Sequence, residues 1–232
     1  GQSVHWQGRG FEGAIEKPTW LAMNLINMVS SRDAQTVEHF HCKYEYHDAA
    51  MADPYHCPHI IEAINHTQNC AEIKDSVMSC EWQSPNLWWP EMEAEMFNAA
   101  TGCGITAEEL EEAAWRSKLL FRAILISHHG RTRRKEMEAI WRTISIPDTW
   151  NEVADWQQWN EMVDLYYESR GWDLETGWPY RETYEKYGLK DVADEMEKLG
   201  FLPRRPAERW HDYGEPPYVQ FTENRKLEPD EQ

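Results

Sequence analysis

The sequence predicts a mostly α-helical protein, with a helical C-terminal domain and a loop-rich N-terminal part. Several segments carry apolar residues at helical spacing between capping residues and glycines, and no segment alternates as a convincing strand. With 232 residues, 41% of them hydrophobic, the chain can bury a substantial core. We expect a loop-rich segment at 1–90, a helical domain at 91–203 and an extended tail at 204–232.

The N-terminal part combines one helix with breaks. "PTWLAMNLINMVSS" at 18–31 predicts a helix, with Pro18 suited to its first turn. Residues 32–70 are dense in His and broken at Pro54 and Pro58, which indicates mostly loop with short helical pieces. "SPNLWWP", bounded by prolines, predicts a further loop.

The clearest helix is "ITAEELEEAAWRSKLLFRAILISHHG". Thr106 and Glu109 form a capping box at its start, and Gly130 suits its C-terminal stop. Its expected apolar face consists of Leu110, Ala113, Ala114, Leu120, Phe121 and Ile124. "PEMEAEMFNAATG", which precedes it, predicts a short helix stopped at Gly102.

Three further helices are expected towards the C-terminus. "WNEVADWQQWNEMVDLYYESRGW" predicts a helix that ends before Gly171. "YRETYEKYG" and "KDVADEMEKLG" predict two short helices, each closed by a glycine. The Pro-rich, charged tail is expected to be extended, and either disordered or draped over a neighbour.

Composition excludes several classes of function. The chain has 23 basic and 41 acidic residues, a net charge of -18, which argues against nucleic-acid and anionic-membrane binding and suits a partner with a basic patch. No apolar run approaches the roughly 18 residues of a membrane span. Five cysteines without close pairing fit a reducing, cytoplasmic compartment. The 13 Trp suit large ligands or subunit contacts, although core packing also explains them. The start "GQSVHW" has the character of a processed end or a fragment.

Two segments carry candidate ligand-binding side chains. "HFHCKYEYHDAAMADPYHCPH" at 39–59 offers imidazole and thiolate, the ligands zinc prefers, but without the usual zinc spacing. We therefore favour polar residues that line a cofactor pocket or a subunit interface, with zinc ligands and ordinary histidines as the alternatives. "HHG" with "RTRRK" at 128–135 suits an anionic ligand, or cations that complement a helix dipole. Cys80 on its own is either a small buried residue or a metal ligand.

Two stretches resemble a known family. Residues 104–134 and 160–200, within a match over 104–202, are similar to the C-terminal domain of the aldehyde ferredoxin oxidoreductases, which are tungsten or molybdenum enzymes with a pterin cofactor. The family pattern "YY…RGWD…G.P…..LE.LGL" is matched by Tyr166, Tyr167, Arg170, Gly171, Trp172, Asp173, Gly177, Pro179, Tyr187, Gly188 and Leu189.

Upstream, "KDSVMSC" at 74–80 is similar to the family motif D-S-L-G-L-C. The resemblance implies that Cys80 is the last of four ligands to a 4Fe-4S cluster, shared here with another chain or segment. It also implies that Asp75 and the backbone near Ser79 hold the tungsten (or molybdenum) bis-pterin. A cluster beside the pterin suits the chemistry, since a two-electron site needs a one-electron relay and thiolates are the usual iron ligands.

The resemblance has clear departures. The first three cluster cysteines of the family, spaced C-x-x-C-x-x-x-C, and its β-rich N-terminal cofactor domain have no counterpart here. The family segment S-N-R-G-A-D-H-L-R appears only as "SSRDAQTVEHF", in which Ser30, Arg32 and Ala34 match and His39 lies late. His39 and His41 lie about 40 residues before Cys80, near where the family places a metal-proximal histidine, so both are candidate catalytic proton carriers.

These residues predict the C-terminal part, or a small subunit, of a tungsten-pterin oxidoreductase. The family default is oxidation of an aldehyde to a carboxylate with ferredoxin or another electron-transfer subunit. Reduction of an aromatic acyl-CoA is the alternative within the family, because that branch also departs from the histidine segment. A non-catalytic helical interaction subunit and a His/Cys zinc module remain as other hypotheses. The expected partners are an N-terminal cofactor domain or subunit, the electron carrier and a small-molecule substrate.

Overall fold

The computed structural model describes residues 21–30, 58–79, 90–145, 154–203 and 213–216. These residues form helices and contain no strand, apart from an isolated antiparallel bridge between Trp172 and Pro179. The mostly α prediction is therefore confirmed. The helices are α1 (Leu21–Val29), α4 (Pro58–Ser76), α5 (Pro90–Thr101), α6 (Ala107–His129), α7 (Arg133–Ile144), α8 (Trp156–Arg170), α9 (Arg181–Lys186) and α10 (Lys190–Lys198).

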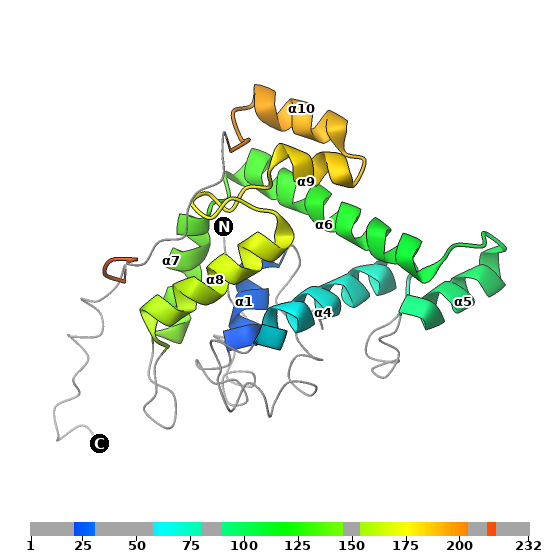
Figure 1. Ribbon diagram of the computed structural model, residues 1–232, viewed down its shortest axis with the longest axis horizontal. Helices are drawn as coiled ribbons and strands as arrows, with labels where there is room; N and C mark the ends of the chain where they lie inside the picture. Colours follow the sequence, from blue (N-terminus) through cyan, green and yellow to red (C-terminus); the bar gives the residue numbers. More distant parts are fainter. Residues whose placement is uncertain (1–20, 31–57, 80–89, 146–153, 204–212, 217–232) are drawn as a thin grey trace, which may run out of the picture.

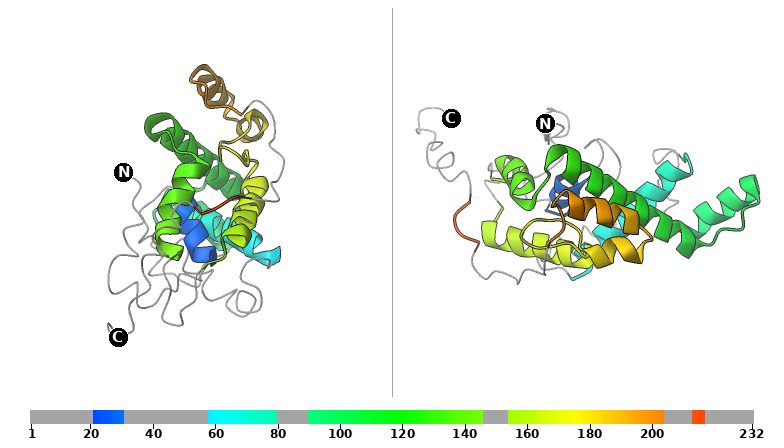
Figure 2. Two further views of the ribbon diagram at one scale, coloured as in Figure 1. Left: turned by 90° about the vertical axis from the view of Figure 1, so that its left-hand side faces the viewer. Right: turned by 90° about the horizontal axis from the view of Figure 1, so that it is seen from above.

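Helix α6 is the long central element, and most of the others pack on it (Figure 1). Helices α9 and α10 lie on one side of α6, while α4 and α5 lie on the other. Helix α1 packs between α4 and α7, and α8 also contacts α4 (Figure 2). No helix among the described residues is long and apolar enough to cross a membrane.

The described core consists of three apolar clusters. The largest joins α1 and α4 to α7 and α8, with Leu25, Ile64 and Trp159 fully buried. A second joins α6 to α9 and α10, and a third joins α4, α5 and α6. Helices from 1–90 and from 91–203 thus share one core. The predicted domain boundary at residue 90 stays a prediction. Apolar side chains from both sides of residue 90 pack against one another.

Helix α4 corrects the prediction for its part of 32–70, where only short helical pieces were expected. It is a helix of 19 residues that begins at Pro58, whose missing N–H costs nothing in a first turn. Its interior contains His, Asn, Thr and Cys, which are weak helix formers. Burial compensates, because residues on several sides of α4 are enclosed, including Ile60, Thr67 and Lys74. Tertiary packing therefore determines this helix.

Helix α6 confirms the predicted ends and partly corrects the predicted face. Thr106 and Glu109 form the capping box, and Gly130 adopts a left-handed conformation at the C-terminus. Leu110 and Ala114 are buried as expected. The prediction is wrong for four residues, which are exposed: Ala113, Leu120, Phe121 and Ile124. The buried face instead continues through Leu119, Ala123 and Ile126.

The remaining helices largely follow the sequence. Helix α5 ends before Gly102, α8 ends at Gly171, and α9 and α10 are each followed by a glycine as predicted. Helix α7 was not foreseen. The described tail residues 213–216 lie against α8, where the Tyr213 hydroxyl donates to Asp164 Oδ2 at 2.7 Å and the Tyr213 carbonyl accepts from Trp156 Nε1. This part of the tail is draped over its own chain.

A buried charge cluster joins α6, α7 and α8. Arg122 of α6 forms an ion pair with Glu136 of α7, and both are almost fully buried. Glu136 also accepts hydrogen bonds from Tyr167 and from Arg131 Nε. Burial alone would raise the pKa of Glu136, but the charges of Arg122 and Arg131 and the hydrogen bonds to it hold the pKa below its ordinary value. Glu136 is therefore ionised at neutral pH.

The substitution Glu136→Gln should destabilise the protein, because it leaves Arg122 buried without its counter-charge. We expect a loss of about 3–5 kcal/mol in the free energy of unfolding at pH 7, measured by denaturant titration. Since folding lowers the pKa of Glu136, its contribution is present above the unfolded pKa and is lost as pH falls through the folded value. The difference between the two proteins should therefore shrink in acid.

Glu138→Gln is the matched control, because Glu138 pairs only with the exposed Arg134 and should change stability by less than about 0.5 kcal/mol. Equal stability of Glu136→Gln and wild type at pH 7 would contradict this account of the cluster.

Candidate functional site

The C-terminal end of α4 contains two of the predicted site residues. Asp75 lies in the last turn of the helix and is exposed, and Ser79 follows the helix and is half-buried. The structure thus brings Asp75 and Ser79 into one tight turn. Cys80, His39 and His41 lie outside the described residues, so their proximity to this turn stays a prediction.

This turn has a defined hydrogen-bond pattern. The Ser79 N–H donates to the Lys74 carbonyl at 2.8 Å, and the Met78 N–H donates to the Asp75 carbonyl at 3.2 Å. Met78 has a φ of 59°, a left-handed conformation that normally favours glycine. Together these features make a Schellman-type stop, which sends the chain sharply away from the helix axis immediately before Cys80.

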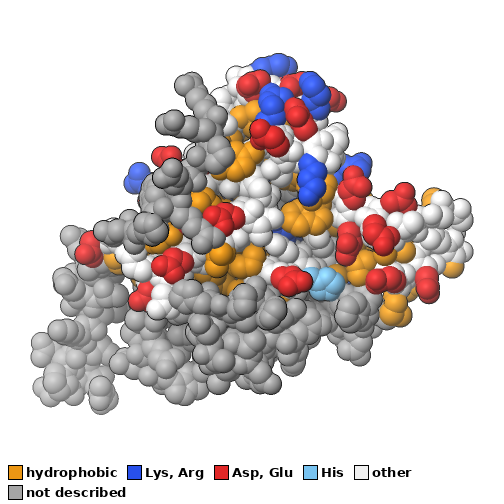
Figure 3. All heavy atoms as spheres, in the orientation of Figure 1, with side chains coloured by type: hydrophobic (Ala, Val, Ile, Leu, Met, Phe, Trp, Pro, Cys, Tyr) orange, Lys and Arg blue, Asp and Glu red, His pale blue; other side chains and the backbone are white. Residues whose placement is uncertain are grey.

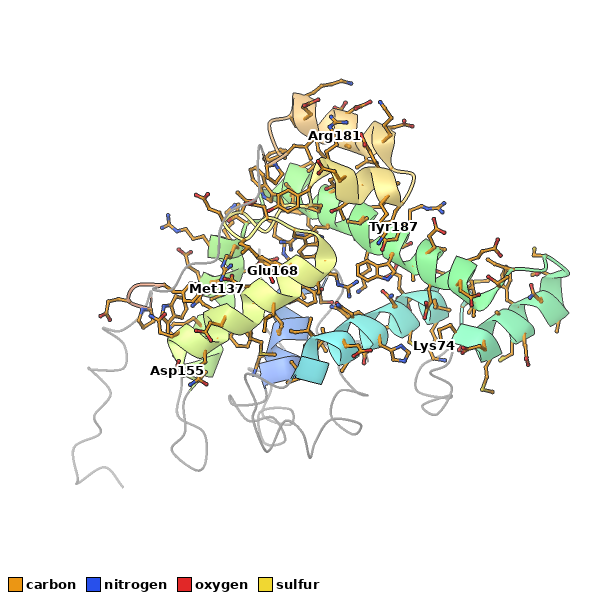
Figure 4. All side chains as sticks on the ribbon, viewed as in Figure 1. Lys74, Met137, Asp155, Glu168, Arg181 and Tyr187 are labelled. Atoms are coloured by element: carbon orange, nitrogen blue, oxygen red, sulfur yellow. The ribbon has the colours of Figure 1, made fainter. Side chains whose placement is uncertain are left out.

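Buried polar contacts hold α4 in place at two points before the turn. Lys74, which is fully buried, forms an ion pair with the buried Glu93 of α5 (Figure 4). Further back, Gln68 Oε1 accepts hydrogen bonds from the Tyr166 hydroxyl at 2.7 Å and from Arg170 Nη2 at 2.6 Å. Leaving one partner of such a buried pair unpaired costs several kcal/mol, so α4 is a rigid support for the turn.

The described residues do not supply a metal site by themselves. They contain no group of three or more His, Cys, Asp or Glu side chains placed to hold an ion. Cys70 is buried beside His66, with Sγ 3.5 Å from Nε2, and Cys103 is exposed. Of the His/Cys segment at 39–59, residues 39–57 lie outside the described residues, and His59 belongs to the first turn of α4. The zinc hypothesis for this segment stays untested.

The basic segment after α6 serves structural contacts. Arg131 Nη1 donates to the Ser30 carbonyl at 2.9 Å, and Arg133 donates to the Leu174 carbonyl and pairs with Asp164. Lys135 Nζ donates to the His129 carbonyl at 3.2 Å, which satisfies a free end of α6. The structure therefore favours helix-end and core contacts over an anion site for these cations.

The stretch after α8, at 171–179, also has a structural role. Asp173 Oδ2 accepts from the Thr176 N–H and hydroxyl, which closes a turn, and the Gly177 carbonyl accepts from Arg122 Nη2 at 2.7 Å. At Gly177 φ is 72°, and a Cβ would lie 2.8 Å from Arg122 Nη2. Only glycine fits this close approach, so the motif fixes the path of the chain between α8 and α9.

The sequence reasoning missed the buried charges that organise this region. Arg122 lies between Phe121 and Ala123 in an apolar part of α6, and Glu136 lies in a strongly charged part of the chain. A single arginine inside an apolar stretch was the available signal. Its partner could not be identified, because the pairing depends on how α6 and α7 pack.

This chain is similar to a known protein family and to a solved structure. The family model "Aldehyde ferredoxin oxidoreductase, domains 2 & 3" matches residues 2–189. A chain in the solved structure "Active site complex BamBC of Benzoyl Coenzyme A reductase in complex with 1,5 Dienoyl-CoA" is 23% identical, with a TM-score of 0.50. That match covers 63% of this chain and 21% of that chain, so this chain spans about a fifth of the solved one, and the likeness concerns the fold. Because the family model covers most of the sequence, the chain belongs to the aldehyde ferredoxin oxidoreductase family, in the part that comprises domains 2 and 3.

Proposed function

We propose that this chain is the C-terminal part, or a subunit, of a tungsten-pterin, iron–sulfur oxidoreductase that carries out low-potential two-electron chemistry. The family match over residues 2–189 carries this proposal. The chain spans only 21% of the similar solved chain, and the described residues hold no complete metal site. The working enzyme therefore needs a pterin-bearing segment or subunit in addition to these residues.

The turn after α4 is the proposed cofactor-binding element. Met78 stands where the family motif D-S-L-G-L-C has glycine, and it keeps the left-handed conformation that a glycine would adopt. The turn is therefore compatible with the motif geometry despite the different side chain. The exposed carboxylate of Asp75 and the backbone at Ser79 would hold the pterin, and the Cys80 thiolate would complete the ligands of a 4Fe-4S cluster. When bound, the metal-pterin supplies the redox chemistry and the cluster relays single electrons.

Two reactions are candidates. The family default is oxidation of an aldehyde to a carboxylate, with ferredoxin or another electron-transfer subunit as acceptor. The departure of residues 30–40 from the family histidine segment favours reduction of an aromatic acyl-CoA as the second candidate. The similar solved complex is named a benzoyl-CoA reductase bound to 1,5-dienoyl-CoA. Turnover of the assembled enzyme with an aldehyde and with benzoyl-CoA distinguishes the two.

A second apolar face of α6 supports assembly with the rest of such an enzyme. Leu120, Phe121 and Ile124 are 36%, 42% and 51% exposed. They point away from the buried residues in the same part of the helix, which are Leu119, Ala123 and Ile126. Figure 3 shows acidic side chains gathered over α5 and the adjoining part of α6. We assign this apolar face to the cofactor-bearing remainder of the enzyme, since four-fifths of the similar chain has no counterpart here.

Metal analysis tests the proposed function directly. The assembled enzyme should contain tungsten (or molybdenum) and iron, while the isolated 232-residue chain, reconstituted anaerobically, should show no cluster absorbance. In the assembly, Cys80→Ser should lower the iron content and Asp75→Asn the pterin-metal content, whereas Cys103→Ser, at an exposed cysteine, should change neither. Zinc alone would support the zinc module, and no metal the interaction subunit. A stoichiometric four-iron cluster on the isolated chain would refute the shared-cluster assignment.

The histidines test the catalytic proposal separately. An imidazole near the metal can carry the proton that accompanies two-electron transfer, because its unperturbed pKa of about 6.5 lies near neutral pH. His39→Ala or His41→Ala in the assembled enzyme should lower turnover by about 10²–10⁴-fold while the metals stay bound. Near-normal turnover with full metal content in both variants would show that the proton comes from elsewhere.

The α6 face predicts a partner contact. Phe121→Ser with Ile124→Ser should weaken association with the cofactor-bearing chain or fragment at least about 10-fold, because both side chains lose apolar contact area. Helix content by circular dichroism should stay unchanged, since neither side chain packs in the core. The matched control is Leu199→Ser, at a residue 49% exposed after α10. Association unaffected by the double substitution would remove this face as the interface.

A further inference from the structure

A small cavity lies between α4, α6 and α8. It has a volume of about 20 Å³, above the roughly 10–15 Å³ that one water molecule needs. Its polar lining includes Gln68, Lys118, Arg122 and Arg170, and indole rings and leucine side chains complete the wall. Three cationic residues therefore contribute to the lining of one partly open, largely apolar space.

Arg170 is the cation in this cavity with unused donors. It is 3% exposed, and its guanidinium lies over the Trp115 ring at 4.1 Å. Nη2 donates to Gln68 Oε1 at 2.6 Å, but Nε and Nη1 have no hydrogen-bond partner among the described residues. Nor does any carboxylate of the described residues form an ion pair with Arg170. A buried charge left in this state is strongly destabilising, which indicates that a counter-ion belongs beside it.

The other buried arginines show the contrast. Arg122 is neutralised by Glu136, and Arg133 by Asp164. The fold therefore provides a carboxylate wherever it buries a guanidinium in this region, except at Arg170. Arg122 also lines the cavity, but its charge is already satisfied by its own ion pair.

Further groups at the cavity favour an anion. The Trp172 Nε1–H is buried and has no hydrogen-bond partner in the described structure. Lys118 adds a positive charge at the cavity, and its Nζ is 3.9 Å from Glu72 Oε2. A water molecule would accept hydrogen bonds here but would bring no negative charge. A carboxylate brings both, and a short apolar stem suits the leucine and indole walls.

We infer that the Arg170 cavity binds one small carboxylate, with Arg170, Trp172 Nε1 and Lys118 as its donors. The carboxylate comes either from a short-chain free acid or from a side chain of the remaining enzyme. The free-acid form stands without the proposed function, whereas the side-chain form rests on it.

Acetate binding to the full 232-residue chain tests the inference. Titration with [¹³C]acetate, followed by carbon NMR and calorimetry with chloride as the ionic-strength reference, should show one saturable site. Arg170→Gln should weaken it at least about 10-fold, as expected for lost hydrogen bonds to a charged group. Arg134→Gln, at a side chain that is 87% exposed and does not line the cavity, should leave it unchanged.

If Arg170→Gln does not fold, Lys118→Gln still tests the inference, because the Lys118 side chain is 11% exposed and Arg170 only 3%. It should weaken acetate binding while circular dichroism stays native. The same titration on the assembled enzyme separates the two sources. Binding that persists identifies a free acid, and binding lost on assembly identifies a side chain. No saturable acetate binding to the chain or to the assembly would overturn the inference and leave the cavity hydrated only.

Discussion

The buried guanidinium of Arg122 is the contact on which the described fold depends. It projects from the central helix α6, pairs with Glu136 of α7, donates to the Gly177 carbonyl after α8, and lies 4.3 Å from the centre of the Trp172 ring. A buried charge tolerates little change in the geometry of its partners. Two segments distant in sequence, α7 and the stretch 171–179, are therefore fixed against α6 by one side chain. Gly177 must be glycine because any Cβ would meet Arg122.

Local signals in the sequence predicted the helices that such signals determine. The capping box at Thr106 and the left-handed glycines Gly130 and Gly171 are made by neighbouring residues, so the ends of α6 and α8 were readable. Helix α4 was not, because its weak helix formers are held by burial against α6 and α8. The buried face of α6 was predicted correctly only at Leu110 and Ala114. Two apolar faces compete, and tertiary packing buried the one through Leu119 and Ala123.

The candidate site was predictable only through its resemblance to a family. The spacing around Cys80 gives no second cysteine nearby, so residue chemistry alone favoured a small buried thiol over a metal ligand. The turn from Asp75 to Ser79 adds a physical point, since Met78 holds a conformation that costs a non-glycine residue energy. Strain of this kind persists where surrounding contacts enforce it, and Lys74, buried against Glu93, provides such a contact one turn earlier.

Two features of the described residues favour additional binding groups, for different physical reasons. Complete folding units rarely leave several large apolar side chains exposed along one helix, yet α6 does so at Leu120, Phe121 and Ile124. They also rarely bury a charge without an ion pair, yet Arg170 is in that position among the described residues. The exposed side chains of α6 would be covered by an apolar surface of a partner. Arg170 would be neutralised by a single negatively charged group. The cofactor-bearing partner that we propose can supply the apolar area. The charge at Arg170 is the more discriminating feature, since a small free acid can satisfy it without any partner protein.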